Sequence, residues 1–123
     1  MPYLLVFFGG GLGAVLRYIV GRGAIALFGP AWPVGTFAVN VIGSVALGLL
    51  AGWFVGRGIE DEPIRLLLAT GFLGGFTTFS AFSLDAVLLW QRGDTAAATL
   101  YVAASVAVSL AGLALGLWIT STP

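Results

Sequence analysis

Apolar residues run through this chain in four long stretches, and short segments with proline, glycine and charged residues separate them. The stretches cover about residues 2–28, 34–56, 66–90 and 95–119. A membrane-spanning helix needs about 20 mostly apolar residues, so each stretch is long enough to cross a bilayer. The segments between them leave no room for a soluble domain. The pattern therefore predicts an all-α membrane protein, a single domain with four transmembrane helices.

Composition supports this prediction and excludes several classes of function. The chain is 59% hydrophobic and only 8% charged, whereas soluble domains carry about 25% charged residues. A soluble enzyme, a disordered linker and a nucleic-acid binder are therefore excluded. The chain has no cysteine and no histidine, and Asp85 is the only carboxylate inside a predicted span. Because no hydrolytic set of residues can form, the protein is predicted not to be an enzyme.

The positive charges give little guidance about orientation. Arg17, Arg22 and Arg92 fall on one side of the membrane if the first two are assigned to the end of the first span, and Arg57 and Arg65 fall on the other. Three against two is a weak bias under the positive-inside rule. Two interpretations stay open: the bias orients every copy alike, or the chain inserts both ways and pairs with an inverted copy.

Polar side chains inside the spans are candidates for function, because they are costly in hydrocarbon unless they are paired or face a wet cavity. Two helix faces carry polar residues at intervals of four, which places them on one side of each helix. These residues are Thr36, Asn40 and Ser44 in the second span, and Tyr101, Ser105 and Ser109 in the fourth. Such faces either pack helices together or form a track for an ion. Asn40 is either a link between helices or a pore ligand, since its amide both donates and accepts.

The third span contains a sequence that disfavours a continuous helix. Residues 71–80 (GFLGGFTTFS) hold three glycines and two threonines, which lower helix propensity. We therefore expect a helix broken at mid-membrane, as in many ion sites, with a glycine-packed kink as the alternative. Phe79 and Phe82 are three residues apart on one face. Their positive ring edges, together with nearby hydroxyls, suit a small anion.

Three segments together closely resemble the Fluc (CrcB) family of fluoride channels. They are residues 10–18 (GGLGAVLRY), residues 36–40 (TFAVN) with Gly43, and residues 71–83, of which 74–83 (GGFTTFSAFS) is the most specific. The resemblance extends over all four spans. It implies a passive fluoride-selective channel of the cell (plasma or inner) membrane, built as a dual-topology antiparallel homodimer with two pores. Such a channel lets a cell expel fluoride that entered as the uncharged acid.

The resemblance also implies roles for individual residues. The fluoride pathway is expected to involve Phe79, Phe82, Asn40, Ser80, Thr36, Tyr101, Ser105 and Ser109. The backbone carbonyls of Gly74 and Thr77 from both subunits are expected to hold a central structural sodium ion. Arg17 resembles a first-helix arginine that serves a vestibule or the dimer contact.

The chain departs from the family pattern at two positions near the aromatic pair. Ala81 stands where the family usually has threonine, and Asp85 stands where glutamate is common. Ala81 lacks the hydroxyl and is given no role. Asp85 has a shorter side chain and stays a candidate for the pore entrance.

Two rival functions fit a small four-span protein. A small multidrug-resistance-type exporter couples drug export to protons through a carboxylate deep in its first helix, and the first span here has none. A holin-like assembly protein would require no particular order in the third span and would leak larger solutes. The sequence disfavours both.

Overall fold

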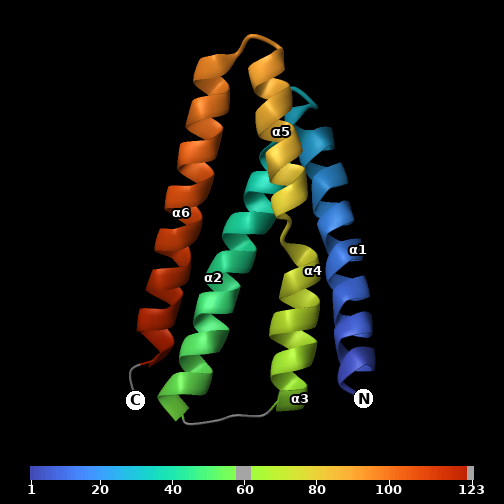
Figure 1. The fold of residues 1–123 in the computed structure, drawn as a ribbon, viewed down its shortest axis with the longest axis vertical. Coiled ribbons are helices and arrows are strands. Elements are labelled where there is room, and N and C mark those ends of the chain that lie inside the picture. The colour runs from blue at the N-terminus through green and yellow to red at the C-terminus, as the bar shows by residue number, and fades with distance from the viewer. Residues whose placement is uncertain (58–61, 122–123) are drawn as a thin grey trace.

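The computed structural model describes residues 1–57 and 62–121, and the regular structure within these ranges is entirely helical. Three helices are long: α1 (Pro2–Phe28), α2 (Val34–Arg57) and α6 (Thr95–Ser121). The third membrane-length segment is divided into four pieces, seen between α2 and α1 and beside α6 in Figure 1. These are α3 (Glu62–Arg65), the π-helical η1 (Leu66–Leu73), α4 (Gly74–Phe76) and α5 (Phe79–Gln91).

Four helical segments in the described ranges are long and apolar enough to cross a membrane. They are Pro2–Phe28, Val34–Gly56, Glu62–Gln91 and Thr95–Ser121. The third begins before the predicted residue 66, because Glu62 and Pro63 open its first turn, where acidic residues and proline suit a helix start. Glu60 and Asp61, which the sequence has between the second and third apolar stretches, lie outside the described residues. The prediction of an all-α, multi-pass membrane protein is confirmed.

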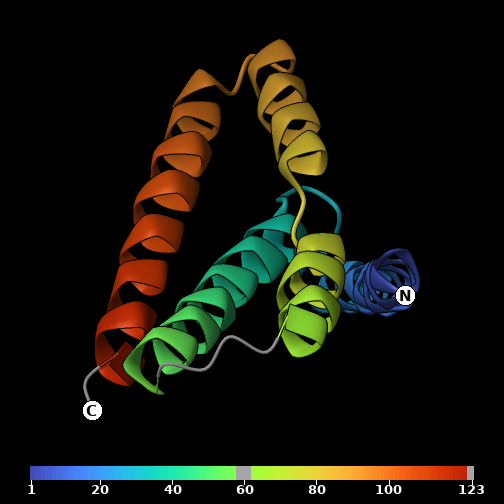
Figure 2. The same cartoon turned by 60° about the horizontal axis from the view of Figure 1, so that its bottom comes forward.

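Helices α2 and α6 pack closely over their carboxyl-terminal halves and diverge toward the start of α2, as Figures 1 and 2 both show. Glycines make this contact possible, because small residues let membrane helices approach at the backbone. A Cβ atom added to Gly48 would overlap the Leu113 carbonyl oxygen, and one added to Gly116 would lie 2.8 Å from the Leu49 nitrogen. Gly48 continues the four-residue spacing of the polar face of α2, and Gly116 lies on α6 opposite it, so both glycines serve as packing residues.

Helix α1 packs in the same way against η1 and α4. A Cβ on Gly13 would overlap the Phe72 carbonyl oxygen and lie 2.8 Å from the Phe76 nitrogen. A Cβ on Gly75 would overlap the Gly10 carbonyl oxygen. Pieces η1 and α4 of the third segment are thus held against α1, whereas α5 lies beside the start of α6 (Figure 2).

The third segment is interrupted between α4 and α5, so the predicted broken helix is confirmed. Thr77 has φ −86° and ψ 158°, and Thr78 has φ −151° and ψ 120°. The interruption therefore falls on the two threonines, whose branched side chains suit extended backbone. The neighbouring glycines Gly71 and Gly75 remain helical and contact α1.

Candidate functional site

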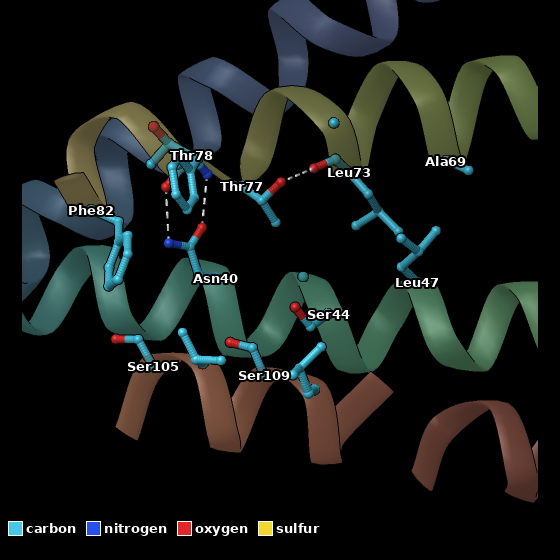
Figure 3. Close-up of a pocket in the computed structure, with 15 residues that line it drawn as sticks. Asn40, Ser44, Leu47, Ala69, Leu73, Thr77, Thr78, Phe82, Ser105 and Ser109 are labelled. Carbon is cyan, nitrogen blue, oxygen red and sulfur yellow. Dashed lines mark hydrogen bonds between the residues drawn. The ribbon is translucent and has the colours of Figure 1, made fainter. Parts of the chain in front are cut away.

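An open groove of about 380 Å³ lies beside the interruption of the third segment. Its walls come from α2, η1, α4, α5 and α6 (Figure 3). Most of the predicted site residues line it: Asn40, Gly74, Thr77, Phe79, Phe82, Ser105 and Ser109. Residues from three separate spans, predicted from spacing and resemblance, are therefore brought to one place.

The two phenylalanines lie next to each other but in different surroundings. Their ring centroids are 5.5 Å apart with an interplanar angle of 47°. Phe79 is 78% exposed, whereas Phe82 is only 9% exposed. Phe82 also packs on Tyr101, with centroids 5.3 Å apart, in a cluster completed by Leu89, Ala97 and Ala98. Phe82 is thus both a groove wall and a core residue, while Phe79 lines the groove and is mostly exposed.

Tyr101 contributes to the groove only through its packing on Phe82. Its hydroxyl donates to Asp85 Oδ2 at 3.3 Å, and neither residue lines the groove. Asp85 lines a separate cavity of about 100 Å³ with Arg92 and Pro30. Asp85 is therefore connected to the aromatic pair through Tyr101, which packs on Phe82.

Asn40 forms two hydrogen bonds with the backbone of Thr78. Its Nδ2 donates to the Thr78 carbonyl at 2.9 Å, and the Thr78 N–H donates to Asn40 Oδ1 at 2.7 Å (Figure 3). The amide therefore links α2 to the interruption. A link between helices was one of the two interpretations of Asn40 that the sequence left open. Because Nδ2 carries two protons, one of them remains for the groove that Asn40 also lines.

Ser105 lines the groove, and its hydroxyl oxygen is buried. The residue is 6% exposed, and its Oγ has no hydrogen-bond partner among the described residues. Buried polar atoms without a partner are rare, and each one needs an explanation. Helix α5 also begins at this groove, and a helix N-terminus carries partial positive charge. A hydroxyl donor, ring edges and a helix N-terminus together suit a small anion.

The interruption leaves backbone oxygens without their usual helical donors. In a continuous helix the N–H groups of Thr78 and Ala81 would donate to the carbonyls of Gly74 and Thr77. Here the Thr78 N–H bonds to Asn40, and the Ala81 N–H bonds to Thr78 Oγ1 at 3.1 Å. Carbonyl oxygens are ligands that hard cations accept. No cluster of three His, Cys, Asp or Glu residues exists in residues 1–57 and 62–121.

Besides Tyr101 and Asp85, three further predicted residues lie outside the groove lining. Ser80 shares a hydrogen bond with the Thr78 hydroxyl at 3.2 Å. Thr36 and Arg17 line a second cavity of about 230 Å³ between α1 and α2. Arg17 Nε also donates to the Gly75 carbonyl at 3.1 Å. The first-helix arginine thus contacts the third segment directly.

Thr78 connects several parts of the site, although the sequence analysis gave it no role. It lines both the groove and the second cavity, it binds Asn40 through its backbone, and its side chain caps α5. Threonine is a good N-cap residue. A threonine directly before residues that can resume a helix was therefore the sequence signal that could have identified Thr78 as the cap of α5. Ser44, from the polar face of α2, also lines the groove.

Comparison with known proteins covers nearly the whole chain. A family model described as CrcB-like protein, Camphor Resistance (CrcB), matches residues 4–117. A Rhodopseudomonas palustris (strain BisB5) protein named "Fluoride-specific ion channel FluC" is 53% identical over 117 residues, 95% of this chain and 94% of that protein. Proteins of the same name from Rhizobium etli (strain CIAT 652) and Novosphingobium aromaticivorans are 54% and 55% identical, over 92% and 91% of this chain and 90% of each relative. The likeness extends from α1 to α6 and includes the groove.

Proposed function

The chain belongs to the CrcB family, and from that premise we propose that it is a passive channel selective for fluoride. Its relatives are named as fluoride-specific ion channels, and the protein is not an enzyme. The observation that carries the proposal is the buried hydroxyl of Ser105, a residue that lines the groove and whose Oγ has no hydrogen-bond partner among the described residues. A small anion with high charge density is the acceptor that such a donor suits.

Conduction through this groove needs several weak contacts rather than one strong site. The ring edges of Phe79 and Phe82, the free Nδ2 proton of Asn40 and the hydroxyls of Ser105 and Ser109 provide them. Each replaces part of the water shell of fluoride, and none carries a full positive charge. Fluoride therefore passes along the groove without being trapped. Tyr101 and Thr36 support this path from behind Phe82 and from the second cavity.

The functional unit is an antiparallel homodimer with two pores. Support comes from the groove itself, which is open on one side of the protomer, with Phe79 exposed at that opening. A second, inverted copy would close each groove. The nearly balanced arginines on the two sides of the chain favour insertion in both directions.

A structural sodium ion at the dimer centre fits the residues present. The carbonyls of Gly74 and Thr77 border the groove, and the donors they would meet in a continuous helix bond elsewhere. Two inverted copies would supply these oxygens symmetrically. The ion would stabilise the interrupted backbone and join the two subunits, while the pore residues carry out transport.

Transport follows the electrochemical gradient. In the inner membrane of a cell, fluoride that has entered as the uncharged acid dissociates, and the membrane potential drives the anion outward. The channel therefore confers resistance to fluoride without coupling to another ion.

The test is efflux from liposomes that contain the purified protein, read with a fluoride electrode and repeated with chloride. We expect rapid fluoride efflux without chloride efflux. Ser105→Ala should slow fluoride efflux by about tenfold or more, because a hydrogen bond to a charged group contributes about 1.5–3 kcal/mol. Ser83→Ala is the matched control, since Ser83 Oγ bonds to the Phe79 carbonyl of its own helix and does not line the groove.

Two results would contradict the proposal. Equal efflux of fluoride and chloride would indicate a nonspecific pore. Fluoride efflux at the wild-type rate in Ser105→Ala would show that the Ser105 hydroxyl does not contribute to the fluoride path.

A further inference from the structure

Arg17 is a partly buried arginine within a membrane-length helix. It does not line the groove, yet it forms a hydrogen bond with the third segment. Its Nε donates to the carbonyl oxygen of Gly75 at 3.1 Å, across 58 positions of sequence. Gly75 lies in α4, directly before the interruption. The partner is thus a backbone carbonyl rather than a carboxylate or another side chain.

The packing of α1 brings Arg17 to this carbonyl. Gly9, Gly13 and Arg17 follow one another at intervals of four, so they lie on one face of α1. A Cβ on Gly9 would overlap the Leu67 carbonyl oxygen, and one on Gly13 would lie 2.8 Å from the Phe76 nitrogen. This face therefore runs along η1 and α4, and Arg17 reaches the point where α4 ends.

At this point the backbone ladder of the third segment stops. The Thr77 N–H still donates to the Leu73 carbonyl at 3.0 Å, whereas the Thr78 N–H turns to Asn40. In a continuous helix the next donor, the Phe79 N–H, would bond to the Gly75 carbonyl. Here Arg17 Nε donates to the Gly75 carbonyl oxygen, which in a continuous helix would accept from the Phe79 N–H.

The charge of Arg17 suits this position. The carboxyl end of a helix carries partial negative charge, which a cation stabilises. An arginine within a membrane is costly unless it has a partner, and an unpaired carbonyl there is costly as well. The hydrogen bond satisfies both groups, so each one stabilises the other.

We propose that Arg17 is a positioning residue that caps the first half of the third helix and keeps the interruption open. Without it, the Gly75 carbonyl is free to accept the Phe79 N–H and the helix can continue through the interruption. The rings of Phe79 and Phe82 then turn away from their places in the groove. The transport consequence rests on the proposed fluoride channel function, but the capping role does not.

Fluoride efflux from liposomes tests the consequence for transport. Arg17→Met should lower the maximal efflux at least about tenfold, equivalent to about 1.4 kcal/mol in the barrier, with little change in the half-saturating fluoride concentration. Arg17→Lys, which retains a cationic donor, should restore a large part of the loss. The matched control is Arg22→Met, because Arg22 lines the same second cavity but bonds within its own helix, to the Tyr18 hydroxyl.

Solid-state NMR of the protein in lipid bilayers tests the cap directly. Labelling glycine with ¹³C at the carbonyl and phenylalanine with ¹⁵N selects the Gly–Phe peptide bonds, and the sequence has two: Gly71–Phe72 and Gly75–Phe76. In Arg17→Met the Gly75 carbonyl resonance should shift, while Gly71 serves as the internal reference. Arg17→Lys should give a smaller shift, and it decides the question if the methionine variant does not fold.

The proposal is overturned if the Gly75 resonance in the Arg17 variants equals that of the wild type. It is overturned as well if Arg17→Met and Arg22→Met lower efflux equally through the half-saturating concentration, since that pattern indicates general attraction of anions. A wild-type protein that conducts no fluoride would refute the channel function, and the NMR comparison would still decide the role of Arg17.

Discussion

Replacing Gly48 with alanine tests whether the close contact of α2 and α6 is a condition for stability. A Cβ on Gly48 would overlap the Leu113 carbonyl oxygen and lie 2.9 Å from the Leu113 carbonyl carbon, whereas ordinary contact begins at 3.4 Å. These neighbours are backbone atoms, so no side chain can rotate away. Helix α6 would have to withdraw by about 0.5 Å or more, which a close-packed interior resists.

Two opposing effects set the magnitude for Gly48→Ala. Overpacking costs about 1–3 kcal/mol, and alanine returns up to about 1 kcal/mol of helix propensity. We therefore expect the free energy of unfolding to fall by about 1–2 kcal/mol. Gly23→Ala is the matched control, because a Cβ there meets nothing within 4 Å. It should leave stability unchanged or slightly higher.

The assay is unfolding of the purified protein in lipid bicelles by titration with sodium dodecyl sulfate, followed by tryptophan fluorescence. Fluoride efflux of the same variants is measured in liposomes. Because Ser105 and Ser109 enter the groove from α6, withdrawal of this helix should also slow efflux in Gly48→Ala. An unfolding midpoint for Gly48→Ala equal to that of Gly23→Ala would refute the argument from backbone contact.

The aromatic pair and Asn40 give two further predictions. Phe79→Ile and Phe82→Ile should both slow fluoride efflux, but only Phe82→Ile should lower the free energy of unfolding, by about 1–2 kcal/mol, because Phe82 packs on two rings. Equal destabilisation of the two variants in the bicelle titration would contradict this distinction. Asn40→Ala should destabilise the protein by about 1–3 kcal/mol, since it leaves the partly buried backbone groups of Thr78 without their Asn40 partners, and it should slow efflux in the same liposome assay. Wild-type stability would show that the two bonds to Thr78 contribute little.

Several features of the fold were predictable from the sequence for a clear physical reason. A bilayer requires long apolar segments, so the four helices followed from hydrophobic run length alone. The interruption of the third helix followed from low helix propensity in residues 71–80. Phe79 and Phe82, three residues apart, were expected on one face, and their rings lie 5.5 Å apart.

Other features could not be predicted, because they depend on which helices meet. The interruption falls on Thr77 and Thr78, since Gly71 and Gly75 are used for contact with α1. Asp85 was a candidate for the pore entrance, and nothing in the local sequence indicated that it accepts a hydrogen bond from the Tyr101 hydroxyl. Local sequence says little about these choices, because they follow from the distance between helix backbones.

The sequence by itself determined the class of protein, its four membrane-length helices, the interruption of the third and the residue types that suit a small anion. Only the tertiary structure decided which groups complete that interruption. Asn40 meets Thr78 and Arg17 meets Gly75 across 38 and 58 positions. Backbone groups freed inside a membrane must find partners within the protein, and the glycine contacts between helices set the register that brings those partners within reach.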